Sequence, residues 1–369
     1  MRILHLLNHT ARNNGHVHVA VDLACEQRRL GHEVAIASGG GDFDALLRRH
    51  GVETFDIDHR RRAGTLLRSS LALRRLMRRW RPDVIHAHMM TSAVLAWAPC
   101  KLQRVPLVTT VHNEFERGAI LMGLGTRVIA VSEAVRDSMN RRGIPRRKLR
   151  VVLNGTIGSA RQEARAEPVA LRSPSILFVG GLHPRKGLPD LLAAFETVHR
   201  AHPAARLHIV GDGPHAQDYR DIAAASSCAG AVFFEGSQAD PSSWMRGADI
   251  FVLPSLADPA PLVLSEAREA GCAVVATQVD GIPQMLGHGD AGLLVPPQAP
   301  QRLAQALLAL LDEPSRLEEW RRRSRNGIGA LTIERVVHET VAVYADAMAH
   351  SGRPAPAGPF TIRTAPRDT

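Results

Sequence analysis

The chain has 369 residues, of which 45% are hydrophobic, 22% charged and only 4% aromatic, and its formal net charge is +10. This length predicts two domains of ordinary size, and the apolar fraction excludes a disordered chain. The four cysteines are widely separated, which excludes a small disulfide scaffold and favours a reducing compartment. No run of about 18 apolar residues occurs, so we expect no membrane-spanning helix. Nearly all basic residues are arginines. This excess attracts phosphate-bearing partners, and a GC-rich coding sequence would produce it equally well.

Short apolar runs alternate with amphipathic stretches in the first half of the chain. The stretch Val17–Leu30 is predicted to be a helix that stops at Gly31, a residue type favoured just after a helix. The compact runs are typical of buried parallel strands. They lie at Ile3–Leu7, Val34–Ala37, Val84–Ala87, Leu107–Val111 and Val128–Val131.

The pattern lapses over residues 157–174, which we interpret as an interdomain linker, and then restarts. The second series of predicted strands is Ile176–Val179, Leu207–Val210, Val232–Glu235, Ile250–Leu253 and Val274–Thr277. A helix over residues 332–349 and a tail rich in proline and glycine follow. Two successive βα series predict an α/β fold of two doubly wound, Rossmann-like parallel-sheet domains, with ligand sites at the carboxyl ends of the strands.

Two predicted turns have the composition of a phosphate site. The first strand leads into Asn13-Asn14-Gly15-His16 before a helix, where a glycine lets backbone N–H groups approach an anion. A plain strand-to-helix turn is the alternative. The first strand of the second series leads into Gly180-Gly181-Leu182-His183-Pro184-Arg185-Lys186-Gly187, which adds two adjacent cations to the glycines. A solvated basic turn is the alternative there.

A third segment places Asp258 before a predicted helix and Glu266 within it. Pro261 fits the first helical position, so the free N–H groups of Leu262 and Val263 would face a phosphate. Glu266 would then accept hydrogen bonds from ribose hydroxyls. A capped helix with two solvated carboxylates explains the same residues.

Together these segments resemble the retaining glycosyltransferases of family 4, which have the GT-B fold. The resemblance covers nearly the whole chain, and the joint order and spacing of its motifs are specific although several are individually weak. The matching segments are the opening strand and loop, Asp83-Val-Ile-His-Ala-His88, Thr110-Val-His-Asn113, Ala130-Val-Ser-Glu133, Asn154-Gly155, the Lys186-Gly187 turn, Val210-Gly-Asp-Gly-Pro214, Phe234-Glu-Gly236 and residues 258–266.

Carried over position by position, the resemblance implies that Lys186 holds the donor diphosphate and Glu266 the ribose, while His112 lies near the donor sugar. A buried structural histidine is the alternative for His112. Gly15 and His16 would close over the phosphates from the first domain, and residues just after Gly236 would meet the nucleobase. The implied catalytic residues are His112, Asp258 and Lys186, and the implied donor-binding residues are Gly15, His16, Gly180, Arg185, Lys186, Gly236, Leu262, Val263 and Glu266.

The implied function is transfer of a sugar from a nucleotide-diphosphate donor to an acceptor hydroxyl, with retention of configuration and without a metal or cofactor, in cell-envelope glycan or glycolipid synthesis. Expected partners are the nucleotide sugar, a lipid-linked or glycan acceptor and an anionic membrane surface. Nucleic acid is not expected, because interleaved aromatic residues are lacking. The alternatives are a nucleotide-sugar 2-epimerase of the same fold and an inactive basic binding protein.

The implied organisation is an N-terminal acceptor-side domain (1–156), a linker (157–174) and a C-terminal nucleotide-sugar-binding domain (175–328). A helix in 329–350 is expected to return to the first domain, and 351–369 to be a disordered tail. We expect the protein in the cytoplasm, either free or peripherally bound to the inner face of the cytoplasmic membrane.

Three positions depart from the family's pattern. Gly181 stands where the family usually has arginine, Asp258 where it has glutamate, and Ala260 where it often has an aromatic residue. Because Gly181 removes one phosphate contact, we hypothesise that Arg185 replaces it; a solvent-facing side chain is the alternative.

Two patterns suggest a metal site and have simpler explanations. Asp56-Ile-Asp58 is a lone D-x-D beside three arginines, and we expect a surface ion-pair cluster. His86 and His88 point the same way from one predicted strand, but no third ligand is identifiable, so packing or substrate contact is favoured.

The stretch from 66 to 81 predicts a helix whose apolar stripe comprises Leu66, Leu73, Leu76, Met77 and Trp80. Its opposite face carries Leu67 and Leu71 among arginines that include Arg74, Arg75 and Arg78. Exposed leucines surrounded by guanidinium groups suit an anionic membrane surface, whereas an ordinary solvated helix face is the alternative.

Overall fold

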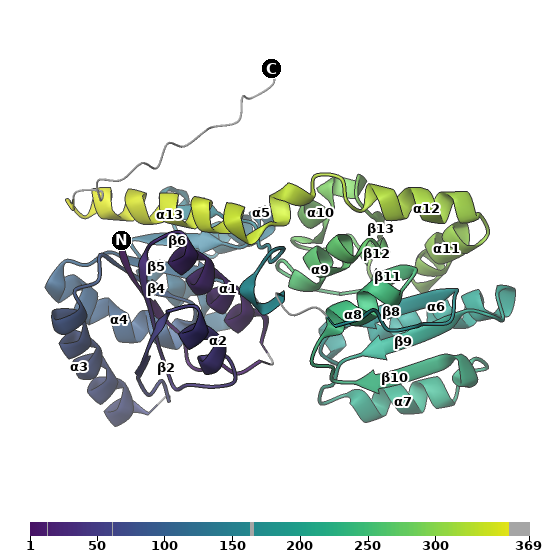
Figure 1. The fold of residues 1–369 in the computed structure, drawn as a ribbon, viewed down its shortest axis with the longest axis horizontal. Helices are drawn as coiled ribbons and strands as arrows, with labels where there is room; N and C mark the ends of the chain where they lie inside the picture. The colour runs from purple at the N-terminus through teal and green to yellow at the C-terminus, as the bar shows by residue number, and fades with distance from the viewer. Residues whose placement is uncertain (13, 61, 163–165, 354–369) are drawn as a thin grey trace, which may run out of the picture.

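In the computed structural model, which describes residues 1–12, 14–60, 62–162 and 166–353, the chain forms two α/β domains, each built on one parallel sheet (Figure 1). The strand order is β3-β2-β1-β4-β5-β6-β7 in the first sheet and β10-β9-β8-β11-β12-β13 in the second. The predicted fold class is therefore confirmed.

The strands follow the apolar runs of the sequence closely. In the first sheet they are β1 (Arg2–Leu6), β2 (Glu33–Ser38), β3 (Glu53–Asp56), β4 (Val84–Ala87), β5 (Leu107–Val111), β6 (Arg127–Ala130) and β7 (Leu149–Val151). In the second they are β8 (Ser175–Val179), β9 (Arg206–Val210), β10 (Val232–Gly236), β11 (Ile250–Leu253), β12 (Ala273–Thr277) and β13 (Leu293–Val295). Central strands such as β4, β5 and β12 are buried along their whole length, because helices cover both faces of a parallel sheet.

The helices divide between the two sheets. The first sheet carries α1 (Gly15–Arg29), α2 (Asp44–Arg49), α3 (Ala63–Trp80), α4 (Met90–Gln103), α5 (Glu133–Arg141) and α13 (Ile333–His350). The second carries α6 (Leu188–Ala201), α7 (Ala216–Ala224), α8 (Pro241–Gly247), α9 (Leu262–Ala270), α10 (Ile282–Met285), α11 (Pro300–Leu311) and α12 (Pro314–Arg323). Within the described residues, no helix is long and apolar enough to cross a bilayer.

Three strands that the sequence did not predict, β3, β7 and β13, are all edge strands. An edge strand has only one neighbouring strand and is less completely covered, so it does not need a continuous apolar run. β3 exposes Glu53 and Asp56 to solvent, and β7 contains Arg150. The pattern of burial that reveals central strands is therefore absent at these edges.

The chain returns to the first domain near its end. Ile157 forms an isolated bridge with Thr332, and a Cβ atom at Gly155 would lie only 2.3 Å from the carbonyl oxygen of Leu331, so a side chain there would not fit. Helix α13 then lies along the first domain, where Tyr344 is fully buried in the core (Figure 1). Residues 163–165 of the expected linker and 354–369 of the expected tail lie outside the described residues.

Both sheets reverse the direction of their strand order once, between β1 and β4 in the first sheet and between β8 and β11 in the second. Ligands of such sheets bind beyond the carboxyl ends of the strands at these switch points. The loop after β1 leads to His16, the loop after β8 contains Lys186, and the loop after β11 contains Asp258. Topology therefore gathers residues that are far apart in the sequence.

One helix boundary differs from the prediction. Pro261 precedes α9 as its N-cap, with φ −72° and ψ 121°, and is not its first helical residue. Its φ suits a helix, but its extended ψ keeps it outside. Leu262 and Val263 are consequently the first two residues of α9.

Candidate active site

Lys186 and Asp258 meet between the loops that follow β8 and β11. The Lys186 ammonium donates a hydrogen bond to Asp258 Oδ2 at 2.5 Å, and both side chains are almost fully buried. Ser255 Oγ lies 3.3 Å from the same oxygen, and Asp280 Oδ2 accepts a hydrogen bond from the Asp258 backbone N–H at 2.7 Å. Asp258 thus reaches Lys186 although aspartate is shorter than the glutamate expected at this position. The loops after β8 and β11 together hold the buried Lys186 ammonium at the switch point of the second sheet.

Gly187 makes this approach of the two loops possible. Its φ is +66°, and a Cβ atom on it would lie 2.0 Å from the carbonyl oxygen of Pro254. Glycine tolerates both the left-handed conformation and the contact. Any side chain at this position would push the Lys186 turn away from the loop that carries Asp258.

Arg185 and Gly181 flank the lysine. The Arg185 side chain is half exposed, and its Nη1 lies 4.0 Å from Asp258 Oδ1. It therefore extends toward the same loop as Lys186 without being buried in it. A Cβ atom at Gly181 would meet only the carbonyl oxygen of Asp212, at 3.9 Å, so this position has room for a side chain.

Glu266 lies one turn into α9, beyond Leu262 and Val263. Burial raises the pKa of the Glu266 carboxyl, and the Arg161 guanidinium, with Nη2 at 3.8 Å from Oε1, opposes this shift. Arg161 donates to both carboxylate oxygens of Asp22 on α1, at 2.8 Å and 2.9 Å. Arg161 could not be predicted from the sequence, because it lies in the segment interpreted as a linker and no pattern distinguishes it from other arginines.

The first domain contributes His16 at the start of α1 and His112 just after β5. Their ring centroids are 6.2 Å apart. Burial lowers the pKa of His16 to about 4 and that of His112 to about 3, so both rings are neutral at pH 7. His16 Nε2 and His112 Nδ1 are shielded from water and have no hydrogen-bond partner among the described residues. Gly15 leaves open space around its Cα.

Hydrogen bonds between described residues also join the first domain to the loop before α9 and to α10. Ser132 Oγ donates to the carbonyl oxygen of Pro259 at 2.7 Å, and Asn154 Nδ2 donates to that of Ala260 at 3.0 Å. The backbone N–H of Glu133 donates to Gln284 Oε1 at 2.9 Å. The loop that contains Asp258 is thereby held against the first domain.

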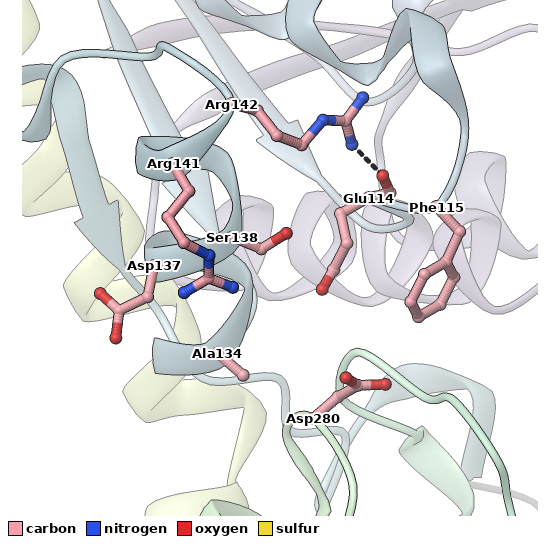
Figure 2. A pocket seen from close by; sticks show the side chains of 8 residues that line it. All are labelled: Glu114, Phe115, Ala134, Asp137, Ser138, Arg141, Arg142 and Asp280. Carbon is pink, nitrogen blue, oxygen red and sulfur yellow. Dashed lines mark hydrogen bonds between the residues drawn. The ribbon is translucent and has the colours of Figure 1, made fainter.

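A pocket of about 440 Å³ opens between the domains. Figure 2 shows Glu114, from the loop after His112, and Asp280, from the second domain, pointing into the same space, with Arg141 reaching toward it from α5. Burial, reinforced by the nearby Asp280, raises the pKa of Glu114 to about 7. Arg142 donates to the backbone carbonyl of Glu114 and holds this loop in place.

The remaining predicted residues are two glycines and a group on α3. Gly180 begins the turn after β8, where a Cβ atom on it would lie 3.9 Å from the Lys186 side chain, and Gly236 ends the edge strand β10, where its carbonyl accepts from the Gly211 N–H at 2.8 Å. The residues proposed for membrane contact are on α3, at the end of the first domain that is remote from the second domain (Figure 1). They are therefore not part of the site between the domains.

The two metal-like patterns are resolved differently. Asp58 accepts hydrogen bonds from the backbone and guanidinium of Arg60, which lowers the pKa of Asp58 to about 2, so it forms the expected surface ion pair. For His86 and His88 the structure does place a third histidine nearby, His5 on β1. His5 could not be predicted as the third histidine, because the pairing of β1 with β4 is not visible in the sequence.

Comparison with known proteins finds two family models that match parts of this chain. The family model described as Glycosyltransferase Family 4 matches residues 13–156, and that described as Glycosyl transferases group 1 matches residues 173–313. The chain is 30% identical over 324 residues to glycogen synthase of Mycobacterium tuberculosis, with 82% of this chain and 78% of that protein covered. It is 30% identical over 267 residues to phosphatidyl-myo-inositol mannosyltransferase of Mycolicibacterium smegmatis, with 67% and 68% covered.

Solved structures share the fold. HepE of Anabaena, in complex with UDP, superposes with a TM-score of 0.79 at 19% identity, with 94% of this chain and 100% of that chain covered. WaaG, described as a glycosyltransferase involved in lipopolysaccharide biosynthesis, superposes with a TM-score of 0.71 at 14% identity, with 95% and 100% covered.

Proposed function

This chain belongs to family 4 of the glycosyltransferases. We propose that it transfers a sugar from a nucleotide-diphosphate donor to an acceptor hydroxyl, with retention of configuration and without a metal ion. The observation that carries the proposal is the buried ammonium of Lys186, held by Asp258 in the loop that leads into α9. A cation and the N–H groups of a helix N-terminus together stabilise a departing diphosphate.

In the proposed reaction, the bond between the sugar C1 atom and the phosphate oxygen breaks while C1 forms a bond with the acceptor oxygen on the same face. The proton of the acceptor hydroxyl passes to the departing diphosphate oxygen. This reaction therefore requires neither a nucleophilic side chain of the protein nor an oxidant or reductant. Lys186 and the first N–H groups of α9 stabilise the negative charge that develops on the diphosphate.

Glu266 and the histidines of the first domain complete the proposed donor site. Arg161, 3.8 Å from Glu266, favours the ionised carboxylate, which accepts hydrogen bonds from both ribose hydroxyls. His16 and His112 face the donor from the other domain, and their unpartnered ring nitrogens are available to its phosphate and sugar oxygens.

We place the acceptor in the pocket between the domains. It adjoins the loop of His112. Its lining combines three carboxyl groups with two guanidinium groups, namely Glu114, Asp137, Asp280, Arg141 and Arg142. Such groups suit a polyhydroxylated acceptor, since hydroxyls both donate and accept hydrogen bonds.

Membrane contact through α3 belongs to the same proposal. Leu67 is 65% exposed and Leu71 46% exposed on a helix rich in arginines. Trp97 and Leu102 are also exposed on α4, the neighbouring helix at this end of the domain (Figure 1). Apolar side chains ringed by cations fit an anionic membrane surface, and one of the relatives is named for a phosphatidyl-inositol acceptor. A lipid-linked acceptor in cell-envelope synthesis would explain this surface.

A donor screen tests the function. Calorimetry with uridine, guanosine and adenosine diphosphate sugars should identify one donor, nucleotide release should require an added hydroxyl acceptor, and NMR of the product should show the donor's anomeric configuration. Turnover should persist in a metal chelator and disappear in Lys186→Ala but not in Lys101→Ala, which alters an exposed lysine of the first domain. Conversion of the donor sugar at C2 without an acceptor would contradict the proposal.

A further inference from the structure

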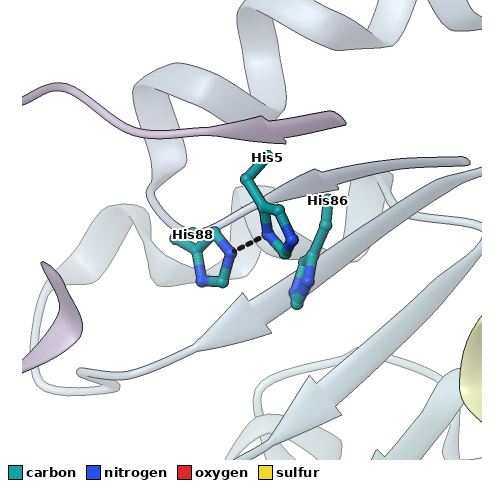
Figure 3. A group of neighbouring side chains, drawn as sticks. All are labelled: His5, His86 and His88. Atoms are coloured by element: carbon teal, nitrogen blue, oxygen red, sulfur yellow. Dashed lines mark hydrogen bonds between the residues drawn. The ribbon is translucent and has the colours of Figure 1, made fainter. Parts of the chain in front are cut away.

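Three buried histidines lie side by side on one face of the first sheet (Figure 3). His5 on β1 is directly opposite His86 on β4 in the register of the sheet. His88, two residues further along, points to the same face. Helix α1 contributes Gln27 to this face, and α13 contributes Tyr344.

Every ring nitrogen of the three histidines already has a hydrogen-bond partner. His5 contacts Gln27 Oε1 through Nε2 at 2.8 Å and His88 Nε2 through Nδ1 at 2.9 Å. His88 Nδ1 lies 3.2 Å from His112 Nε2. His86 contacts the Tyr344 hydroxyl at 2.7 Å and Thr110 Oγ1 at 2.6 Å. A bound metal ion would have to displace these partners, so the geometry is that of a hydrogen-bond relay.

Neutral imidazole has one donor and one acceptor nitrogen, which makes such a relay directional. The Gln27 carbonyl oxygen can only accept, so His5 donates to it from Nε2 and must accept at Nδ1. His88 then donates from Nε2 to His5 and accepts at Nδ1, where His112 donates from Nε2. The remaining nitrogen of the relay, His112 Nδ1, is left with a lone pair.

We propose that Gln27 is a positioning residue: through His5 and His88 it sets the tautomer of His112, so that His112 Nδ1 is the acceptor for a hydroxyl group of the donor sugar. The identity of this ligand rests on the proposed function, whereas the relay does not. His112 Nδ1 is shielded from water and lacks a partner among the described side chains, and such an acceptor is costly unless a ligand satisfies it.

A second branch holds the Gln27 amide in the required orientation. Its NH₂ group donates to the Tyr344 hydroxyl at 3.3 Å. The Tyr344 proton is then directed to His86 Nδ1, and His86 donates from Nε2 to Thr110. If the amide turned over, both branches would reverse together, and His112 would present an Nδ1–H donor. The orientation of the Gln27 amide therefore determines whether His112 Nδ1 accepts or donates a hydrogen bond.

The test is the tautomer of His112 in protein labelled with ¹⁵N-histidine, read from long-range ¹H–¹⁵N spectra and assigned by the signal lost in His112→Asn. We expect the Nε2–H form in the wild type and in Gln27→Glu, whose carboxylate also accepts from His5. Gln27→Leu should populate the Nδ1–H form. Thr110→Val is the matched control, because it cuts only the His86 branch and should leave His112 unchanged.

Binding of the donor provides the second readout. Gln27→Leu should weaken binding of the nucleotide sugar by up to about tenfold, the value of one hydrogen bond, while binding of the nucleoside diphosphate alone stays constant. Gln27→Glu should restore the affinity.

An Nδ1–H signal for His112 in the wild type, or the same tautomer in Gln27→Leu, would overturn the relay. A zinc titration that shifts the signals of His5, His86 and His88 would also overturn it in favour of a metal site. If Gln27→Leu changes the tautomer of His112 as expected but leaves the affinity for the nucleotide sugar unchanged, the proposed contact between His112 Nδ1 and the sugar hydroxyl would be overturned. Failure of the wild type to bind any nucleotide sugar would refute the proposed function instead.

Discussion

The guanidinium of Arg161 lies 3.8 Å from the carboxylate of Glu266, with Nη2 facing Oε1. Arg161 comes from the segment between the domains and Glu266 from α9 of the second domain. Two hydrogen bonds to Asp22 hold Arg161 in place, and Asp22 in turn accepts from the Thr156 hydroxyl at 2.6 Å. A ribose bound by Glu266 would therefore lie beside a cation that is anchored to the first domain.

Glu266→Ala should weaken binding of the nucleotide sugar by about 1.5–3 kcal/mol, because buried ribose hydroxyls lose a charged acceptor. Calorimetry on the folded variant measures this change. Glu318→Ala, which alters an exposed glutamate on α12, is the control and should bind as the wild type does. Unchanged donor affinity in Glu266→Ala would refute the assignment of Glu266 to the ribose.

Arg161→Met should make donor binding more sensitive to acid. Burial raises the pKa of Glu266 and Arg161 lowers it, so removal of the cation moves this pKa further up. Protonation of Glu266 removes acceptor capacity, and the affinity of the variant should start to fall at a higher pH than that of the wild type. Calorimetric titrations between about pH 5 and pH 8 measure the difference, and superimposable profiles would exclude this role of Arg161.

Arg185→Ala should lower kcat/KM strongly if Arg185 replaces the family's arginine at the phosphate clamp. One unit-charge contact near 4 Å contributes about 4 kcal/mol at an effective dielectric of about 20, before desolvation and the screening of a half-exposed side chain reduce it. Gly181→Arg should partly restore the activity of Arg185→Ala, because position 181 has space for a side chain.

Steady-state kinetics on Arg185→Ala, Lys186→Ala and Gly181→Arg, alone and combined, measure this compensation. Wild-type activity in Arg185→Ala would show that Lys186 and the helix N–H groups form the clamp without Arg185.

Leu67→Ser combined with Leu71→Ser should release the protein from anionic vesicles. The two leucines are exposed on α3 and would enter the membrane interface, while Arg74, Arg75 and Arg78 would bind anionic headgroups. Sedimentation with vesicles should depend on anionic lipid and decrease as salt is added. Equal pelleting with neutral vesicles, or no loss in the double variant, would rule out this surface as the membrane contact.

The melting temperature should fall as the pH falls from about 6.5 toward about 4. Burial lowers the pKa of His5 and His16 to about 4 and that of His112 to about 3. Histidine in the unfolded chain titrates near 6.5, so over this range the unfolded state binds protons that the folded state does not. Stability is therefore greatest above about pH 6.5 and decreases by about 1.4 kcal/mol per pH unit for each such histidine.

Scanning calorimetry in buffers of different ionisation enthalpy measures this linkage. Unfolding near pH 5.5 should take up several protons, although Glu114, whose pKa is raised to about 7, opposes this by releasing one. A constant melting temperature between about pH 6.5 and pH 5, or net proton release, would show that these histidines are not neutral in the folded protein.

The central strands and the loops that follow them could be predicted from the sequence alone. Val84–Ala87, Leu107–Val111 and Ile250–Leu253 have the predicted bounds, because a strand buried on both faces requires a local apolar run that is visible without knowledge of its neighbours. The turn at Lys186 was recognisable for a similar reason, since glycines and cations that follow a strand are a local signature. The edge strands β3, β7 and β13 carry no such local requirement and were missed.

Contacts between distant segments were decided only by the tertiary structure. Strand order brings His5 opposite His86, although 80 residues separate them. The sequence of neither strand indicates which strand it pairs with. The return of α13 supplies Tyr344 to the same histidines, and the path of the connecting segment brings Arg161 to Glu266. The pattern of apolar residues in a sequence indicates which segments are buried. It does not indicate which segments contact one another, because that depends on long-range packing and the apolar surfaces of the segments are chemically alike.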